Sequence, residues 1–238
     1  MRKLILLLLI CVGCKAKPKE IVPDNLFQQF DFSTFISTDS IYGSNGTFDT
    51  SFYRIDFYFQ CKKDKNNPKI YAVKGFDQLR NHVTPLEGTI TINKIIVHNG
   101  NFYFPDSIDK KNQLVEIEGD YEFFENKNYS GSGVFRGKLS FMLHKDSINA
   151  LKDDLSDWMQ DGYSNFIYSG NWQSYKNNKV KPCTWCDGRC YDRGFDEGDG
   201  EFFVNQKYEK NGWEVDSVGS LKELKPKWWI KKNVPNML

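Results

Sequence analysis

Apolar and polar residues alternate along much of the chain. The segment at 53–61, YRIDFYFQC, places Tyr53, Ile55, Phe57 and Phe59 on one face of a predicted strand, with polar residues between most of them. Side chains in a strand point to opposite faces in turn, so this alternation is typical of a strand with one buried face. Cys61 shares the apolar face and is predicted to point inward.

A second pattern, apolar-x-Gly-x-apolar, occurs in four segments. LEGTITI begins at Leu86, and IEGDYEF, FRGKLSF and YSGNWQS follow along the chain. The glycines, Gly88, Gly119, Gly137 and Gly170, fall in register with the apolar positions, so they are predicted on the inner face. Glycine there permits sharp bending of a sheet and leaves space for aromatic side chains. A strongly curved antiparallel sheet is expected.

Composition supports a fold that is mainly all-β. The chain has three alanines among 238 residues and 16% aromatic residues, which disfavours helices and suits pleated sheets. Turn-rich segments such as KDKNNPK, HNGN and NKNYSGSG separate the strands. We therefore predict a curved antiparallel meander that closes into a barrel or folds into a sandwich. In this pattern and length the chain resembles lipocalin-like barrels, a likeness of fold alone.

One inserted helix is predicted near 147–160. Ile148, Leu151, Leu155 and Trp158 recur at helical spacing, and Asp146 or the following serine is a suitable N-cap. We expect this helix to cover an edge or an open end of the sheet.

The amino-terminal segment, MRKLILLLLICVGC, has a basic start followed by a short apolar run. The run is about half of the roughly 20 residues that a membrane-spanning helix needs, so it indicates a signal peptide over 1–13. The ending Gly13-Cys14 resembles the lipobox of bacterial lipoproteins, which implies cleavage before Cys14 and its lipidation. Residues 14–25 then form a polar tether. This resemblance implies a lipid-anchored protein of the bacterial cell envelope, at the outer membrane.

Net charge argues against a nucleic-acid partner. Removal of the signal peptide takes away Arg2 and Lys3, which leaves 30 basic residues (32 minus 2) against 31 acidic ones. A nearly neutral chain has no overall field to attract nucleic acid. The expected partners are the membrane, through the lipid anchor, and a protein of the envelope.

The sequence KPCTWCDGRC places Cys183, Cys186 and Cys190 close together. An oxidising envelope favours two structural disulfides, and a tetrahedral zinc site is the alternative. Three cysteines cannot all pair among themselves, so both interpretations require Cys61 to reach the cluster. The Cys/Asp/Gly-rich extension at 177–217 is expected to pack irregularly on a β domain at 26–176, followed by a Trp/Lys tail at 218–238.

Downstream, the run DEGDGEF resembles the acidic Asp/Gly loops of calcium-binding proteins. The resemblance implies Asp196, Asp199 and Glu201 as ligands of a calcium ion, with Gly200 at the turn.

The sequence contains no hydrolase or nucleotide-binding motif, and its three histidines have no nucleophile motif beside them. We therefore assign no catalytic residue and predict a lipid-anchored binding or interaction protein that requires no cofactor. Two alternatives remain open. One is a lipocalin-like carrier of a small apolar ligand, and the other is a metal-dependent hydrolase that uses the Cys/Asp segment. An unfilled apolar cavity favours the carrier, whereas a filled interior with an exposed aromatic patch favours the interaction protein.

Overall fold

The computed structural model describes residues 25–38, 44–98, 113–146, 148–153, 164–189, 194–197 and 203–214. The predicted signal peptide, lipidated Cys14 and almost all of the tether, as well as the Trp/Lys tail, lie outside these residues.

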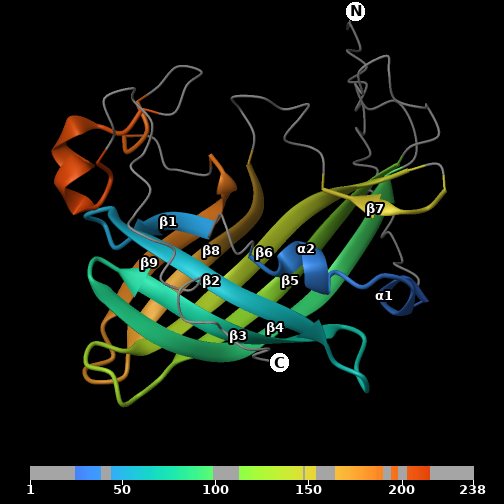
Figure 1. Ribbon diagram of the computed structural model, residues 1–238, viewed down its shortest axis with the longest axis horizontal. Helices are drawn as coiled ribbons and strands as arrows, with labels where there is room; N and C mark the ends of the chain where they lie inside the picture. Colours follow the sequence, from blue (N-terminus) through green and yellow to red (C-terminus); the bar gives the residue numbers. More distant parts are fainter. Residues whose placement is uncertain are drawn as a thin grey trace, which may run out of the picture.

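The described chain is mainly β, as predicted, and forms one closed antiparallel barrel (Figure 1). Two short helices come first, α1 (Asn25–Gln29) and α2 (Ser33–Ile36). The strands are β1 (Ser44–Phe48), β2 (Tyr53–Lys63), β3 (Ile70–Leu79), β4 (His82–His98), β5 (Gln113–Glu125), β6 (Gly133–Lys145), β7 (Leu151–Lys152), β8 (Ser164–Ser174) and β9 (Val180–Gly188).

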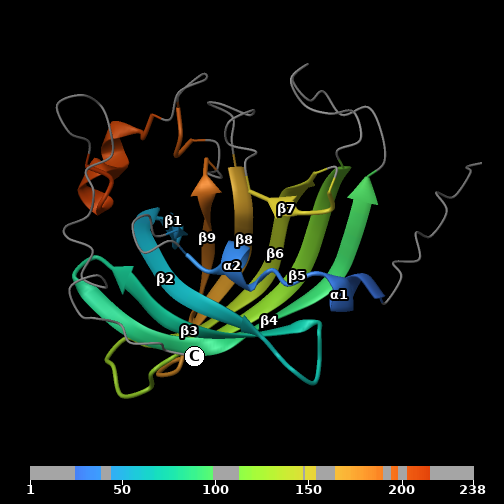
Figure 2. The ribbon, with the colours of Figure 1, turned by 45° about the vertical axis from the view of Figure 1, so that its right-hand side comes forward.

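The barrel follows a simple meander. Strands β2 to β6 each pair with the next, β6 pairs with β8, and β8 pairs with β9. The first strand, β1, pairs with both β2 and β9 and so closes the circle, while the two-residue β7 only flanks β6. The strands curve strongly around a common interior (Figure 2).

The interior confirms the predicted alternation. Ile55, Phe57, Phe59 and Cys61 all belong to the buried core of the barrel. At the centre, the fully buried Trp185 stacks on Phe57 at 4.0 Å between ring centroids and on Tyr168 at 4.7 Å. Aromatic rings therefore fill the middle of the barrel.

The inward glycines make room for these rings. Gly137 and Gly170 are paired across β6 and β8, and a Cβ on either would lie within 2.8 Å of the Tyr121 hydroxyl. A larger residue at either position would collide with Tyr121, which is itself buried beside Trp185.

The outer face of β2 is buried as well. Arg54 and Asp56 form an ion pair at 2.9 Å, and both side chains are 8% exposed. The Arg54 guanidinium lies 5.7 Å from the ring centre of Trp213, whose indole N–H donates to the Phe52 carbonyl at 2.7 Å. Trp213 follows a 3-10 helix at Gln206–Asn211, orange-red in Figure 1, and belongs to a small second core.

The extension predicted to begin at residue 177 contributes a strand to the barrel. In β9, Cys183 and Trp185 point inward, and Pro182 lies just beyond the residues that pair with β1. A proline is tolerated there because its missing N–H is not required by β1. The barrel therefore extends past the predicted boundary at 176.

The predicted helix near 147–160 does not begin where the pattern placed it. The Asp146 carboxylate accepts the N–H groups of Ile148 and Ala150, and Asn149 has a φ of 67°. These contacts form a tight turn. After it, Leu151 of β7 pairs with Lys145 of β6. A local side-chain bond thus prevails over the helical spacing. Residues 154–163 lie outside the described part of the chain.

Candidate functional site

The barrel wall changes character along β2. Strand β1 reaches only as far as Phe57, where Ser44 is its partner, whereas β2 continues to Lys63. Beyond Phe57, side chains of α2 and the residues after it cover this edge of β2 in place of a strand. The Thr38 hydroxyl accepts the N–H of Phe59 at 2.8 Å.

Two more hydroxyls continue this cover. Ser37 Oγ accepts the N–H of Cys61 at 2.8 Å, and Ser33 Oγ accepts that of Lys63 at 3.0 Å. Three alternate N–H groups of one strand edge are thereby satisfied by side chains, which spares them the cost of unpaired burial.

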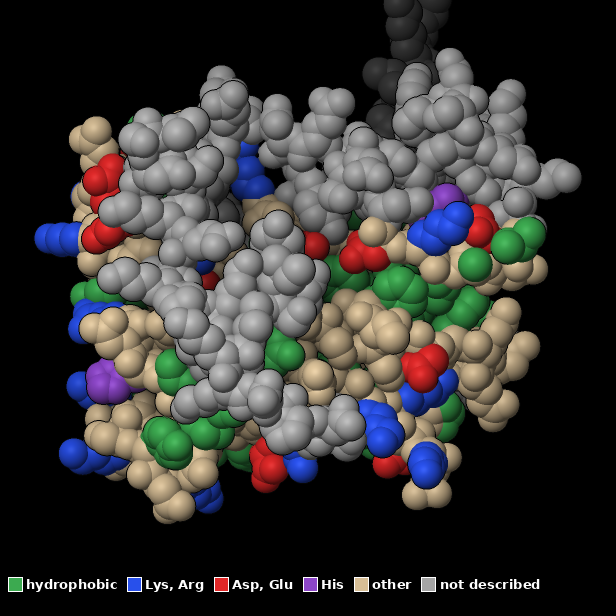
Figure 3. All heavy atoms as spheres, viewed as in Figure 1, with side chains coloured by type: hydrophobic (Ala, Val, Ile, Leu, Met, Phe, Trp, Pro, Cys, Tyr) green, Lys and Arg blue, Asp and Glu red, His purple; other side chains and the backbone are tan. Residues whose placement is uncertain are grey.

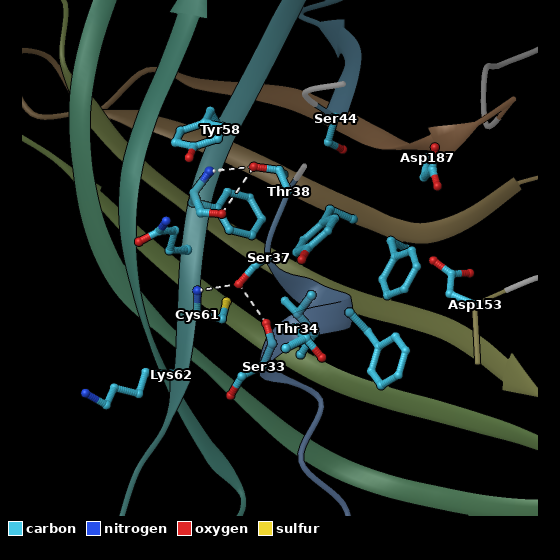
Figure 4. Close-up of a pocket in the computed structure, with 16 residues that line it drawn as sticks. Ser33, Thr34, Ser37, Thr38, Ser44, Tyr58, Cys61, Lys62, Asp153 and Asp187 are labelled. Atoms are coloured by element: carbon cyan, nitrogen blue, oxygen red, sulfur yellow. Dashed lines mark hydrogen bonds between the residues drawn. The ribbon is translucent and has the colours of Figure 1, made fainter. Parts of the chain in front are cut away.

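A cavity of about 870 Å³ lies beneath this edge, at the end of the barrel that α2 covers (Figure 4). One wall comes from residues 33–38 and another from residues 58–62 of β2. Asp153 and Asp187 lie across the cavity from Cys61 (Figure 4). The cavity is lined by both aromatic and polar side chains and opens to solvent.

Tyr168 is the most informative lining residue. Its side chain is 1% exposed, and its hydroxyl has no hydrogen-bond partner among the described residues. Burial raises the pKa of Tyr168 well above its usual range, so the hydroxyl stays protonated. A buried hydroxyl without a partner costs free energy, and a polar atom of a bound molecule would remove that cost.

The backbone next to Tyr168 is irregular. The pairing of β8 with β9 shifts between Asn165 and Tyr168, and Phe166, within this irregularity, has a φ of 47°. A bulky residue rarely adopts this left-handed conformation. Phe166 lines the cavity and stacks on Phe141 at 4.9 Å, so the strained residue helps to shape the site.

Cys61 also lines the cavity, behind the Ser37 hydroxyl. It is a free thiol with 8% exposure, and burial raises its pKa far above that of an ordinary cysteine. The thiolate needed for nucleophilic attack is therefore negligible at neutral pH.

The predicted approach of Cys61 to the other cysteines is not formed. Cys183 pairs with Phe48 of β1, and Phe48 pairs in turn with Tyr53 of β2, so these three residues lie at one level of the barrel. Cys61 is eight residues further along β2 than Tyr53. Cys61 and Cys183 are both free. Cys186 is buried in β9, and Cys190 lies outside the described residues. Alternation along a strand predicts the face of a residue but not its level along the barrel axis.

The predicted calcium ligands are described only in part. The Asp196 carboxylate accepts the Arg189 side chain and, at 3.1 Å, the N–H of Phe203. Asp199 and Glu201 lie outside the described residues. Within the described ranges, no cluster of three or more His, Cys, Asp or Glu side chains is arranged to hold a metal, and calcium and zinc stay predictions.

The opposite end of the barrel holds a pair of buried acids that the sequence analysis did not identify. Asp77 and Glu125 are 2% and 6% exposed, and they lie close enough for each to affect the pKa of the other. Glu125 also accepts the Trp172 indole N–H and the Gly133 backbone N–H, each at 2.5 Å. Both acids occupy inward positions of alternating strands, which is the signal that could have revealed them.

Burial determines the protonation of this pair. It raises the pKa of both Asp77 and Glu125, and the charge of Glu125 raises that of Asp77 further. The two carboxyl groups therefore bind protons more readily than ordinary carboxyl groups. Cys183 lies close enough for both acids to raise its pKa, after the larger effect of burial. This cluster is enclosed, whereas the cavity beside Tyr168 is open.

Apart from its core, the molecule shows a mixed surface. Acidic and basic side chains are interspersed over the described part of the face in Figure 3. Within the described residues, no helix combines the length and apolarity needed to cross a bilayer.

Comparisons with protein-family models, with curated protein sequences and with solved structures found no significant match.

Proposed function

We propose that this protein is a non-catalytic binding protein whose barrel takes up a small molecule at the end covered by α2. The observation that carries this proposal is Tyr168, which lines the cavity and whose buried hydroxyl has no partner among the described residues. Binding sites for small molecules combine mainly apolar walls with a few polar groups that orient the ligand. Tyr168 supplies both, because its ring belongs to the core and its hydroxyl makes no bond within the described part of the chain.

The lining indicates the chemistry of the ligand. Phe59 and Phe166 offer aromatic surface beside Tyr168, and the hydroxyls of residues 33–38 line the outer part of the cavity. A flat apolar molecule with a hydrogen-bonding atom at its inner end fits this arrangement. We infer an amphipathic ligand rather than a purely apolar one.

The carrier alternative is favoured over a protein-interaction surface by the cavity at one end of the barrel. Large exposed apolar side chains within the described residues are Phe124, Tyr129, Ile148, Val180 and Phe203. Individual exposed apolar residues are ordinary on protein surfaces. The barrel centre is filled, as the interaction alternative requires, but a cavity large enough for a small ligand remains at one end.

Two probes that differ by one hydroxyl test this proposal. We expect 1-naphthol to bind saturably, as measured by titration calorimetry, and naphthalene to bind more weakly. In Tyr168→Phe the affinity for 1-naphthol should fall about 10-fold, as expected for one buried hydrogen bond, while naphthalene should bind as before.

Tyr175→Phe is the matched control. The Tyr175 hydroxyl is also buried without a partner among the described residues, but Tyr175 lines a different groove, beside Lys127. An equal loss of affinity in both variants, or no saturable binding of either probe, would contradict the proposal.

We further propose that the protein is attached to a membrane of the bacterial envelope through a lipid on Cys14. The support is the apolar segment ending in Gly13-Cys14 and the polar residues after it. In cells that process lipoproteins, the full chain should partition into the detergent phase, and its mass should exceed that of the unmodified chain beginning at Cys14. Cys14→Ser should remove both properties, and detergent partitioning that persists in this variant would disprove the lipid at Cys14.

A further inference from the structure

The segment that covers the cavity is held to the barrel in an unusual way. Residues 33–38, which we name the α2 cover, contact the edge of β2 through the hydroxyls of Ser33, Ser37 and Thr38. A backbone bond reinforces them, from the Thr38 N–H to the Phe59 carbonyl at 3.0 Å. A strand in this position would be part of the barrel ladder. The α2 cover is attached mainly by side chains.

The barrel does not depend on these bonds for its own continuity. Phe59, Cys61 and Lys63 are paired on their other side with Gly75, Val73 and Tyr71 of β3. The hydrogen-bond ladder between β2 and β3 therefore stays complete when the bonds between β2 and the three hydroxyls break. Water can then satisfy the three exposed N–H groups, as it does at an ordinary sheet edge.

The α2 cover has a firm attachment at one end. Phe32, just before it, is 1% exposed and packs edge-on against Phe141 at 5.6 Å, and its N–H lies 3.3 Å from the Tyr71 hydroxyl. Within the cover, the Ser37 hydroxyl donates to the Ser33 carbonyl at 2.6 Å. A four-residue helix is not stable by itself, so the three hydroxyl contacts are expected to form and break together.

We infer that the α2 cover opens as one unit about Phe32, widening the mouth of the cavity while the barrel remains folded. A wider mouth would ease entry of the small ligand, and for that role alone the inference rests on the proposed function. Movement of the cover does not require a ligand. The inference that the cover moves and the proposal that the cavity binds a ligand can therefore be disproved separately.

Cys61 provides a direct readout of opening. Its thiol belongs to a residue that is 8% exposed on the cavity wall beside the cover, so movement of the cover should speed its alkylation by iodoacetamide. In the full chain without ligand, Ser37→Ala removes one of the three bonds to β2, together with the bond from Ser37 to the Ser33 carbonyl, and should raise the alkylation rate of Cys61 by at least roughly 5-fold. Site-resolved mass spectrometry of the alkylated chain measures this rate.

Two controls separate local opening from unfolding. Thr34→Ala alters a cavity-lining residue whose hydroxyl makes no bond to β2 among the described residues, and should leave the rate at the wild-type value. Cys183, buried at another level of the barrel, should be alkylated equally slowly in every variant. An unchanged Cys61 rate in Ser37→Ala, or a parallel rise at Cys183, would overturn the inference.

Amide hydrogen exchange tests whether the cover moves as one unit. The amides of Phe59, Cys61 and Lys63 should exchange with one common opening rate, and Ser37→Ala should accelerate all three. Acceleration at Cys61 alone would show that each hydroxyl opens independently and would disprove concerted opening.

Discussion

Glu125 at one end of the barrel and Tyr168 at the other differ in how far their buried polar atoms are satisfied. At the end away from α2, Glu125 accepts the Trp172 indole N–H and the Gly133 N–H. At the α2 end, Tyr168 lines the cavity and its buried hydroxyl has no partner among the described residues. A satisfied polar cluster stabilises a fold, whereas an unsatisfied group beside open space indicates a binding site.

The largest expected effect comes from the aromatic stack that divides the two ends. Trp185→Ala removes a fully buried ring in contact with Phe57 and Tyr168, and should lower the free energy of unfolding by about 3–5 kcal/mol. Urea denaturation measures the loss. Phe124→Ala, at a residue 38% exposed, should change the stability by less than about 1 kcal/mol. Similar losses in both variants would show that the stack does not organise the core.

A smaller change in stability is expected when one polar group is removed at each of the two sites. Trp172→Phe leaves the Glu125 carboxyl without its indole donor and should cost about 1–3 kcal/mol of stability. Tyr168→Phe removes a hydroxyl that has no partner within the described part of the chain, and should be neutral or slightly stabilising. The urea midpoints of the two variants give both changes in stability, provided that the slope of the unfolding free energy against urea concentration is unchanged. A destabilised Tyr168→Phe would mean that its hydroxyl serves the fold, and the distinction between the two ends would fail.

The smallest expected effect is a difference in pH dependence. Folding raises the pKa of Asp77 and Glu125 above their ordinary values of 3.8 and 4.5. The folded protein thus binds more protons, and the stability from this pair is complete below those values and declines as pH rises toward the raised ones. Asp77→Asn should reduce this decline, by on the order of 1 kcal/mol between about pH 4 and 7.

Tyr168→Phe is the control at the other end, because it removes no group that titrates in this range. Thermal melts across the pH series should show the wild-type slope in Tyr168→Phe and a shallower slope in Asp77→Asn. Identical slopes in all three proteins would contradict the raised pKa values of the two acids.

The inner face of the barrel was predictable because alternation depends on local geometry. Phe57, Phe59 and Gly137 lie where a period of two residues places them. The same argument reaches Asp77 and Glu125, which were overlooked because acidic residues are usually taken to face solvent.

The level of a residue along the barrel was not predictable. It depends on how far each strand is shifted against the next, and this shift placed Cys61 and Cys183 apart. The cavity could not be predicted from the sequence either. It arises where the short β1 ends and α2 takes its place beside β2. The helix predicted from apolar spacing does not begin after Asp146, because the carboxylate of this residue stabilises a turn.

The seam between β1 and β9 has a consequence for how the protein is made. Ser44 and Cys186 meet across it although 142 positions separate them in the chain. A ribosome must therefore release nearly the whole polypeptide before the circle of strands can close, and until then β1 and β8 each present an unpaired edge to other chains. Premature stops within β9 should yield aggregates rather than a smaller stable protein.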